Sequence, residues 1–233
     1  MLSQLSGKRK KVDMTIILKQ MKGALCAVAL LLTSTVAMGV EVKDLFMNEP
    51  GVVFELLPEA TRISMVSYYE NEQDVYATNR AGNSSHIIDL KPRHMSIEMS
   101  AGRKVELALL IQGKDSAIMV IEHFSIPYPD AVVTFYDTRW KPLKTDKLFK
   151  TPTLESFIKP GTPAQVVRDI TQNVSFPLID YELNADNLSS MTARQHLADF
   201  YTATDYARWK PYLYETLNYA ITGKKITLTP LKK

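Results

Sequence analysis

Six short segments rich in β-forming residues follow one another between Asp74 and Asp137, and they constrain the fold more than any other feature. Turn residues such as Gly, Pro, Asn and Asp separate the segments, and no helical pattern intervenes. Strands joined by such short connections pair with their neighbours in antiparallel order. The sequence therefore predicts a six-stranded antiparallel meander over residues 75–78, 85–90, 95–99, 104–111, 117–124 and 131–136.

The fourth and fifth segments form the clearest hairpin of this sheet. Residues 105–111 and 118–124 are almost continuously apolar, and a Gln-Gly-Lys-Asp turn over 112–115 joins them. A strand with one exposed face alternates apolar and polar residues, whereas a continuously apolar strand is covered on both faces. We therefore expect this hairpin to lie at the centre of the sheet with both faces covered.

Helices are predicted on either side of the strand-rich region. Residues 53–71 carry apolar side chains at the spacing of one helical face, and Pro58 is expected at the first position of the main helix, with residues 53–57 as a preceding turn. A second helix is expected to open with Thr162 as N-cap and Pro163 at its first position, and to run to about residue 172.

The chain returns to strands after a connector rich in Pro and Lys over residues 140–161. The predicted elements are strands at 178–183 and 188–197, a helix at 204–210 and a closing hairpin over 215–221 and 225–229. This order predicts the α+β class, with helices packed on one face of an antiparallel sheet. We expect residues 40–150 and 151–233, the smaller part, to form two α+β halves or one continuous domain.

Residues 19–39 have the layout of a secretory signal peptide. Lys19 and Lys22 precede an apolar run over 24–32, and Ala37-Met38-Gly39 supplies the small residues of a cleavage site after Gly39. The apolar run is too short to span a bilayer, and no later segment can do so. We expect residues 1–39 to combine an over-extended gene start with a cleaved leader, and the mature chain to reach the periplasm or the cell surface.

Removing this leader changes the charge of the chain. The leader holds six of the 28 basic residues and one of the 25 acidic residues, which leaves 22 basic and 24 acidic residues and a net charge of −2. A nearly neutral domain has no electrostatic basis for binding nucleic acid. The single cysteine, Cys26, also lies in the leader, which excludes disulfides, a thiolate nucleophile and cysteine metal sites from the mature chain.

Histidine spacing gives no metal-binding motif. His86, His94, His123 and His196 match none of the spacings that bring metal ligands together on a helix or turn. His86 and His94 lie on adjacent predicted strands, where a two-histidine site is conceivable. Exposed or hydrogen-bonded histidines are the simpler interpretation, and we expect no metal or cofactor.

One pair of carboxylates has a spacing suited to glycoside hydrolysis. Asp180 and Glu182 lie two residues apart on a predicted strand, so they share a face at a distance of about 6–7 Å. Glycosidases need an acid and a base separated by roughly 5–9 Å. Charged residues that alternate along a strand also commonly mark its solvated face, which is the competing interpretation.

Aromatic residues concentrate near the C-terminus. Seven of the 21 aromatic residues fall between Phe200 and Tyr219. Tyr and Trp suit stacking on sugar rings or anchoring a protein interface. Arg208, Trp209 and Tyr212 are the candidate surface residues for such binding, although the same rings could instead cover one face of the sheet.

Several segments taken together resemble a known family. They are Thr78-Asn79-Arg80 with Gly82, Phe135-Tyr136-Asp137 with Trp140 and Leu143, and Pro152-Thr153-Leu154 with Phe157. The chain from about Leu45 to Leu228 is similar to an uncharacterised family of small exported proteins from Gram-negative gut and oral anaerobes, classed as a domain of unknown function. The resemblance implies export to the envelope and an α+β domain, and it transfers no catalytic residue.

These observations favour a non-enzymatic interaction module of the cell envelope that binds an envelope protein or a glycan. The alternative is an envelope glycan hydrolase that uses Asp180 and Glu182. No sequence feature indicates the oligomeric state.

Overall fold

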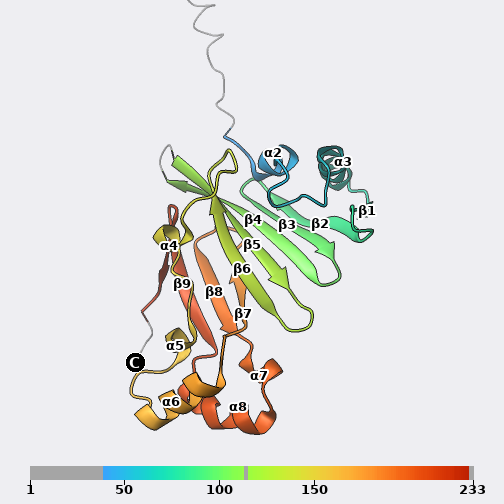
Figure 1. The fold of residues 1–233 in the computed structure, drawn as a ribbon. Helices are drawn as coiled ribbons and strands as arrows, with labels where there is room; N and C mark the ends of the chain where they lie inside the picture. The colour runs from blue at the N-terminus through green and yellow to red at the C-terminus, as the bar shows by residue number, and fades with distance from the viewer. Residues whose placement is uncertain (1–38, 113–114, 231–233) are drawn as a thin grey trace, which may run out of the picture. The chain divides into compact units, whose positions relative to one another are not determined.

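Two antiparallel sheets organise the residues that the computed structural model describes, which are 39–112 and 115–230 (Figure 1). The first sheet is a six-stranded meander in chain order, and the second has the order β10-β9-β8-β7. The first sheet consists of β1 (Ala77–Thr78), β2 (Ser84–Lys91), β3 (His94–Ser100), β4 (Arg103–Gln112), β5 (Asp115–Phe124) and β6 (Asp130–Tyr136). The second consists of β7 (Ile179–Leu183), β8 (Ser190–Gln195), β9 (Thr216–Thr222) and β10 (Lys225–Leu228). The predicted meander and the α+β class are confirmed.

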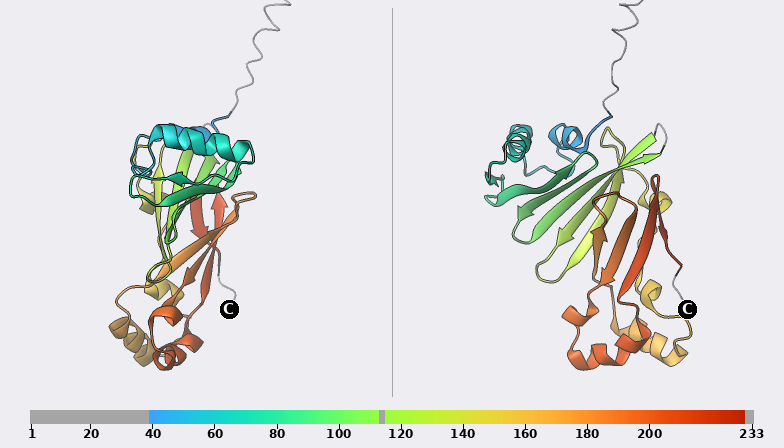
Figure 2. Two further views of the ribbon diagram at one scale, coloured as in Figure 1. Left: turned by 90° about the vertical axis from the view of Figure 1, so that its right-hand side faces the viewer. Right: turned by 180° about the vertical axis from the view of Figure 1, so that it is seen from behind.

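Two helices cover one face of the six-stranded sheet. These are α2 (Val42–Met47) and α3 (Glu59–Glu70), and Figure 2 shows them on the side opposite the second sheet. Because side chains alternate along a strand, Ile97, Leu107 and Val120 point together at this helix-covered face, where they are fully buried. The helices contribute Phe46 and other apolar residues to the same core.

The second sheet covers the opposite face of the first. Leu110, Met119 and Phe135 on the first sheet belong to one buried cluster with residues such as Met191 and Leu217 on the second. Strands β4 and β5 are therefore buried on both faces, as their continuous apolar sequence predicts.

Short helices occupy two connections of the chain, from β6 to β7 and from β8 to β9. They are α4 (Thr145–Leu148), α5 (Leu154–Phe157), α6 (Ala164–Asn173), α7 (Leu197–Phe200), α8 (Ala203–Trp209) and a 3₁₀ turn (Lys210–Tyr212). Several of them contribute apolar side chains to the core between the sheets, among them Phe157, Ile170 and Leu197. This core draws on residues from both sides of the expected boundary near residue 150, and the compact unit that contains it begins at Val40.

Two proline positions differ from the prediction. Pro58 and Pro163 are the N-caps of α3 and α6 rather than their first helical residues, because their ψ angles of 151° and 137° are extended. The main helix consequently begins at Glu59, one residue later than predicted, and a turn precedes it as predicted. The carboxylate of Glu49 and the guanidinium of Arg62 organise that turn, since both side chains are buried and lie 3.8 Å apart.

No helix of the described residues is long and apolar enough to cross a membrane. Apart from Gly39, the predicted signal peptide lies outside the described residues, as do Gly113 and Lys114 of the β4–β5 turn.

Candidate functional site

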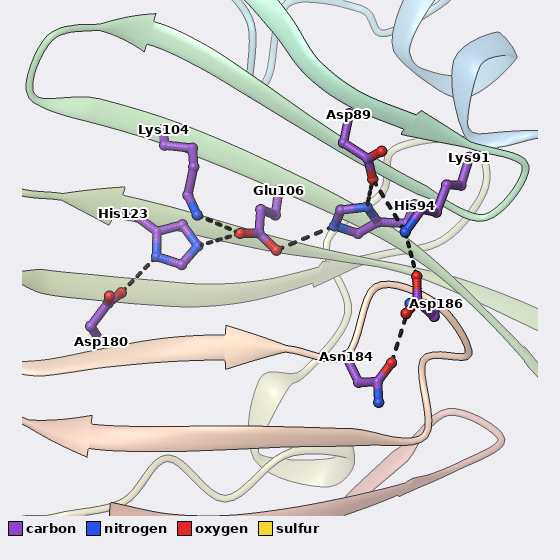
Figure 3. A network of polar contacts seen from close by, with 9 residues as sticks. All are labelled: Asp89, Lys91, His94, Lys104, Glu106, His123, Asp180, Asn184 and Asp186. Carbon is purple, nitrogen blue, oxygen red and sulfur yellow. Dashed lines mark hydrogen bonds and ion pairs between the residues drawn. The ribbon is translucent and has the colours of Figure 1, made fainter.

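Five titratable side chains form a line from the edge of the first sheet to the second sheet (Figure 3). Asp89 on β2, His94 on β3, Glu106 on β4 and His123 on β5 lead to Asp180 on β7. His94, Glu106 and His123 alternate with residues of the helix-covered core, so they face the second sheet. We call these five residues the polar line.

Glu106 is the centre of the polar line. Its Oε2 lies 3.3 Å from Nε2 of His94, whose Nδ1 lies 3.1 Å from Oδ2 of Asp89. The ammonium of Lys104 donates a hydrogen bond to Oε1 of Glu106 at 2.6 Å. The Glu106 carboxylate is thus surrounded by nitrogen atoms in an almost fully buried position, where an unpaired charge would be costly.

His123 connects the polar line to the second sheet. Its Nε2 lies 3.4 Å from Oε1 of Glu106, and its Nδ1 lies 2.6 Å from Oδ1 of Asp180. The contact with Asp180 is a hydrogen bond, and one between an imidazolium and a carboxylate is stronger than a neutral one. His123 therefore joins the two sheets through a charged contact.

The surroundings shift the pKa values of three groups. Burial acts to raise the pKa of Glu106, but His123, His94 and Lys104 outweigh it and hold this pKa well below its usual value. Burial likewise acts to raise the pKa of Asp180, and the hydrogen bond with His123 reverses the direction. Burial acts to lower the pKa of His123, but Asp180 and Glu106 raise it overall. The polar line therefore favours two ionised carboxylates around a protonated His123.

The polar line lacks the contacts expected of a nucleophilic catalytic site. In the described part of the chain, no serine or threonine hydroxyl is hydrogen-bonded to His94 or His123. No group of three or more His, Cys, Asp or Glu among the described residues is placed to hold a metal ion. The contacts instead run from one member of the line to the next, which suits a structural connection between the sheets.

A second ionic contact joins the sheets next to the polar line. Nζ of Lys91, at the end of β2, donates to Oδ1 of Asp186 at 2.6 Å and lies 3.7 Å from Oδ2 of Asp89. Asp186 belongs to the β7–β8 turn, where its amide donates to the side chain of Asn184. A hollow of about 220 Å³ lies beside this contact, between the β2–β3 and β7–β8 turns.

A larger hollow, of about 660 Å³, lies at the outer end of the first sheet. Its walls come from the start of α2, the C-terminal end of α3 with the segment that follows, and the second half of β2. We call it the β2 groove. Its lining residues are Glu41, Lys43, Tyr69, Glu70, Glu72, Gln73, Asp74, Ile87, Leu90, Lys91 and Pro92.

The β2 groove has an excess of negative charge. Lys43 is neutralised by Glu70 at 2.7 Å and by Glu41 at 3.5 Å. Glu72 and Asp74 are exposed, and neither forms an ion pair with another described residue. The β2 groove therefore combines an open acidic rim with apolar floor residues from β2.

Asp180 and Glu182 share one side of β7, as predicted, because Ile179, Tyr181 and Leu183 are buried on the other. Glu182 is exposed, whereas Asp180 is bonded to His123. The lowered pKa of Asp180 does not suit a proton donor, which needs a raised pKa. Neither residue lines the β2 groove or the hollow at the turns. Their catalytic role stays a prediction.

The predicted surface position of Trp209 is wrong. Its side chain is only 1% exposed, and its Nε1 donates to Oδ2 of Asp169 at 2.7 Å, because α8 turns this ring into the core between the sheets. Arg208 is exposed and donates to Oδ1 of Asp205 at 2.9 Å, and Tyr212 is half-buried. Whether Arg208 and Tyr212 bind a partner stays a prediction.

The two-histidine site considered for His86 and His94 does not form. The strand register places His86 opposite Glu98 and His94 opposite Lys91, and the ring of His86 packs on Tyr76. The sequence analysis did not connect His94 with Glu106 and His123. The available signal was weak: Glu106 is a lone carboxylate in the apolar stretch 105–111, whereas His94 and His123 have other polar residues near them on their strands.

Exposed aromatic rings gather elsewhere, where the β5–β6 turn meets the segments around α7. Phe200 lies 5.2 Å from Tyr128 and 5.9 Å from Phe176 between ring centroids. Phe176 is 55% exposed and Phe200 is 42% exposed. Tyr201 connects this cluster to the buried Trp209. We call Tyr128, Phe176 and Phe200 the aromatic cluster.

Comparisons with known proteins support the predicted resemblance. A family model described as "Protein of unknown function (DUF3256)" matches residues 34–225. A domain of an uncharacterised protein from Porphyromonas gingivalis W83 has a similar structure, with a TM-score of 0.71 and 19% identity over 81% of this chain and 97% of that chain. Comparison with the curated proteins gives no match. The resemblance to a domain of unknown function is confirmed, and the expected source in gut and oral anaerobes stays a prediction.

Proposed function

The chain belongs to the DUF3256 family, described only as of unknown function, and from its own geometry we propose that it is an exported envelope protein that binds a protein partner in the β2 groove. One observation carries this proposal: the β2 groove is an open hollow of about 660 Å³ whose rim carries charges that no described residue neutralises. The charged groups of the polar line, by contrast, contact one another inside the protein.

Export is supported by the sequence of the leader. Residues 19–39 have the three regions of a secretory signal peptide. The compact unit begins at Val40, the residue that follows the expected cleavage site. We therefore propose that the mature chain acts in the periplasm or at the cell surface.

The first test is affinity capture of the protein from a cross-linked envelope fraction of its host. A variant with Glu72→Lys and Asp74→Lys reverses the free charges of the β2 groove. A control with Asp146→Lys and Glu55→Lys makes the same charge change at exposed positions outside the groove. We expect one envelope protein to be recovered with the wild type and the control, and to be lost with the groove variant. Equal recovery with all three proteins would contradict the proposal.

A second candidate, glycan binding, is favoured by the exposed aromatic cluster. The faces of Phe176 and Phe200 can stack on sugar rings in the way that aromatic side chains bind other flat apolar surfaces. The test is binding of the purified protein to polysaccharides extracted from the envelope, with Phe176→Ala and Phe200→Ala variants alongside. Binding that both substitutions weaken would favour this candidate, and binding that neither changes would remove it.

A further inference from the structure

We propose that the partner supplies an extended, basic segment that adds a strand to the outer edge of β2. This inference rests on the proposed function, because it names the kind of chain that the β2 groove takes. It follows from an open sheet edge, the position of the groove along that edge and the charge of the groove rim.

The outer edge of β2 is open over most of its length. β1 pairs only with Ser84 and Ser85, so β2 from His86 to Lys91 has no strand beside it in the described part of the chain. An unpaired edge presents backbone N–H and C=O groups that an added strand can pair with. Strand addition of this kind is a recurring mode of peptide recognition, in which the backbone provides affinity and side-chain pockets provide specificity.

The β2 groove lies along this open half of the strand. Ile87 and Leu90 form part of its floor, and a β-bulge between Ile87 and Asp89 turns both side chains toward the helix-covered core. Tyr69, from the end of α3, forms part of the opposite wall and is exposed. Alternate side chains of an added strand would therefore enter the groove between α3 and β2, and the others would face outward.

The bulge also limits which strands can pair here. The β-bulge bends and twists the edge of the strand, and Lys91 places a charge at the end of β2. Both features discourage unselective pairing with other strands. An added strand must therefore gain from the side chains of the groove as well as from the backbone. The available edge, residues 86–91, accommodates a segment of about six residues.

The charge of the groove selects a basic segment. Four carboxylates line it against two ammonium groups, and each of the two lysines is already paired with acidic residues. Glu72 and Asp74 at the rim form no ion pair with another residue of the described ranges. A Lys or Arg of the partner that reaches them would gain favourable electrostatic interactions, whereas an acidic segment would be repelled.

The test begins with selection of displayed ten-residue peptides against the protein purified from cells that express the full chain. We expect selected sequences in which Lys or Arg alternates with Val, Ile or aromatic residues. For the best synthetic peptide, the Glu72→Lys, Asp74→Lys variant should weaken affinity at least tenfold, and the Asp146→Lys, Glu55→Lys control less than twofold. Failure to enrich any peptide, or enrichment of acidic peptides, would overturn the inference.

Two further measurements distinguish strand addition from docking through side chains alone. Methylation of alternate backbone amides of the peptide should abolish binding when the methyl groups face β2. A peptide methylated at the other set of alternate amides, which face away from β2, should still bind. The amides of residues 86–91 that face away from β3 should exchange at least tenfold more slowly in the complex, while exchange in β9 and β10 is unchanged. Equal tolerance of both methylation patterns, or protection confined to α3, would contradict strand addition.

The outcome separates this inference from the proposed function. If the envelope partner is captured through the β2 groove while no basic extended peptide binds, the proposed function stands and strand addition is wrong. If groove charge reversal has no effect on the captured partner, the proposed function itself fails.

Discussion

Both faces of the six-stranded sheet carry buried apolar residues, but only the face toward the second sheet also buries a row of charged groups. On the helix-covered face, Ile97 and Leu107 belong to a cluster of buried apolar residues. On the opposite face, His94, Glu106 and His123 are 3%, 8% and 7% exposed, and each depends on a charged neighbour. The stabilisation from burying an apolar side chain depends on the area removed from water and not on which apolar neighbour covers it. A buried charge, in contrast, requires a particular charged or hydrogen-bonding partner. The comparison implies that the two faces respond differently to substitution and to pH.

The largest effect is expected on the helix-covered face. Phe46→Ala removes a fully buried ring that meets Phe54 edge to face at 4.9 Å between centroids. Loss of the ring and the cavity left behind should lower the free energy of unfolding by about 3–5 kcal/mol. Urea unfolding measures this change at pH 5.5 and pH 8.5, and the loss should be the same at both. A Phe200→Ala control removes a ring that is largely exposed, so a comparable loss there would undermine the comparison.

A somewhat smaller loss is expected at the centre of the polar line. Glu106→Leu leaves His94, His123 and Lys104 without their shared carboxylate. Removing one partner of a buried charge pair should lower the free energy of unfolding by about 3 kcal/mol. The control is Glu98→Leu on β3, which removes a carboxylate that forms no ion pair with another described residue. If the two variants lose the same stability, the contacts of the polar line contribute nothing specific.

The third prediction concerns pH, to which only the polar face should respond. The raised pKa of His123 gives a stabilising contribution that is complete below its usual value of 6.5 and is lost as the pH rises through the raised pKa. The lowered pKa values of Glu106 and Asp180 give contributions that are complete above their usual values of 4.5 and 3.8 and are lost on acidification. Stability from these groups is therefore complete between about pH 4.5 and 6.5.

Urea unfolding of the wild type and of Asp180→Asn checks this pH dependence. The wild type should be less stable at pH 8.5 than at pH 5.5, with a smaller difference than either substitution above produces. In Asp180→Asn, His123 loses the contact that most strongly raises its pKa, so the decline should shrink. An unchanged decline would assign the pH dependence to other groups.

The smallest effect is expected at the second contact between the sheets. Lys91→Ala removes the ion pair with Asp186, whose side chain is almost completely exposed. Exposed ion pairs contribute little because water and salt screen them. The midpoint of urea unfolding should therefore stay within experimental error of the wild type. A clear loss of stability would mean that the end of β2 depends on this contact.

The strands were largely predictable from the sequence because their signals are local. Five of the six predicted strands of the meander agree with β2–β6 to within about two residues at each end, and the central hairpin is buried on both faces as expected. β1 is shorter than predicted, because only Ala77 and Thr78 pair with β2. The single-turn helices α4, α5 and α7 carry too few residues for a helical period to emerge, so tertiary contacts determine them.

The candidate sites were much less predictable, because they depend on contacts between distant segments. His123 and Asp180 are 57 residues apart, and only the packing of one sheet on the other brings them together. The β2 groove is formed by segments from α2, α3 and β2, each of which is unremarkable alone. Trp209 was misplaced because an aromatic residue suits a core and a binding surface equally well.

Site-specific photo-crosslinking in the host tests the central claim most directly. A photoreactive phenylalanine derivative that replaces Tyr69 places the reactive group in the β2 groove. The same derivative in place of Tyr212 or Phe200 places it at the predicted surface near Arg208 or in the aromatic cluster. The account predicts one discrete crosslinked envelope protein from position 69 and none from the other two positions. A crosslinked partner from position 212 or 200, with none from position 69, would contradict it.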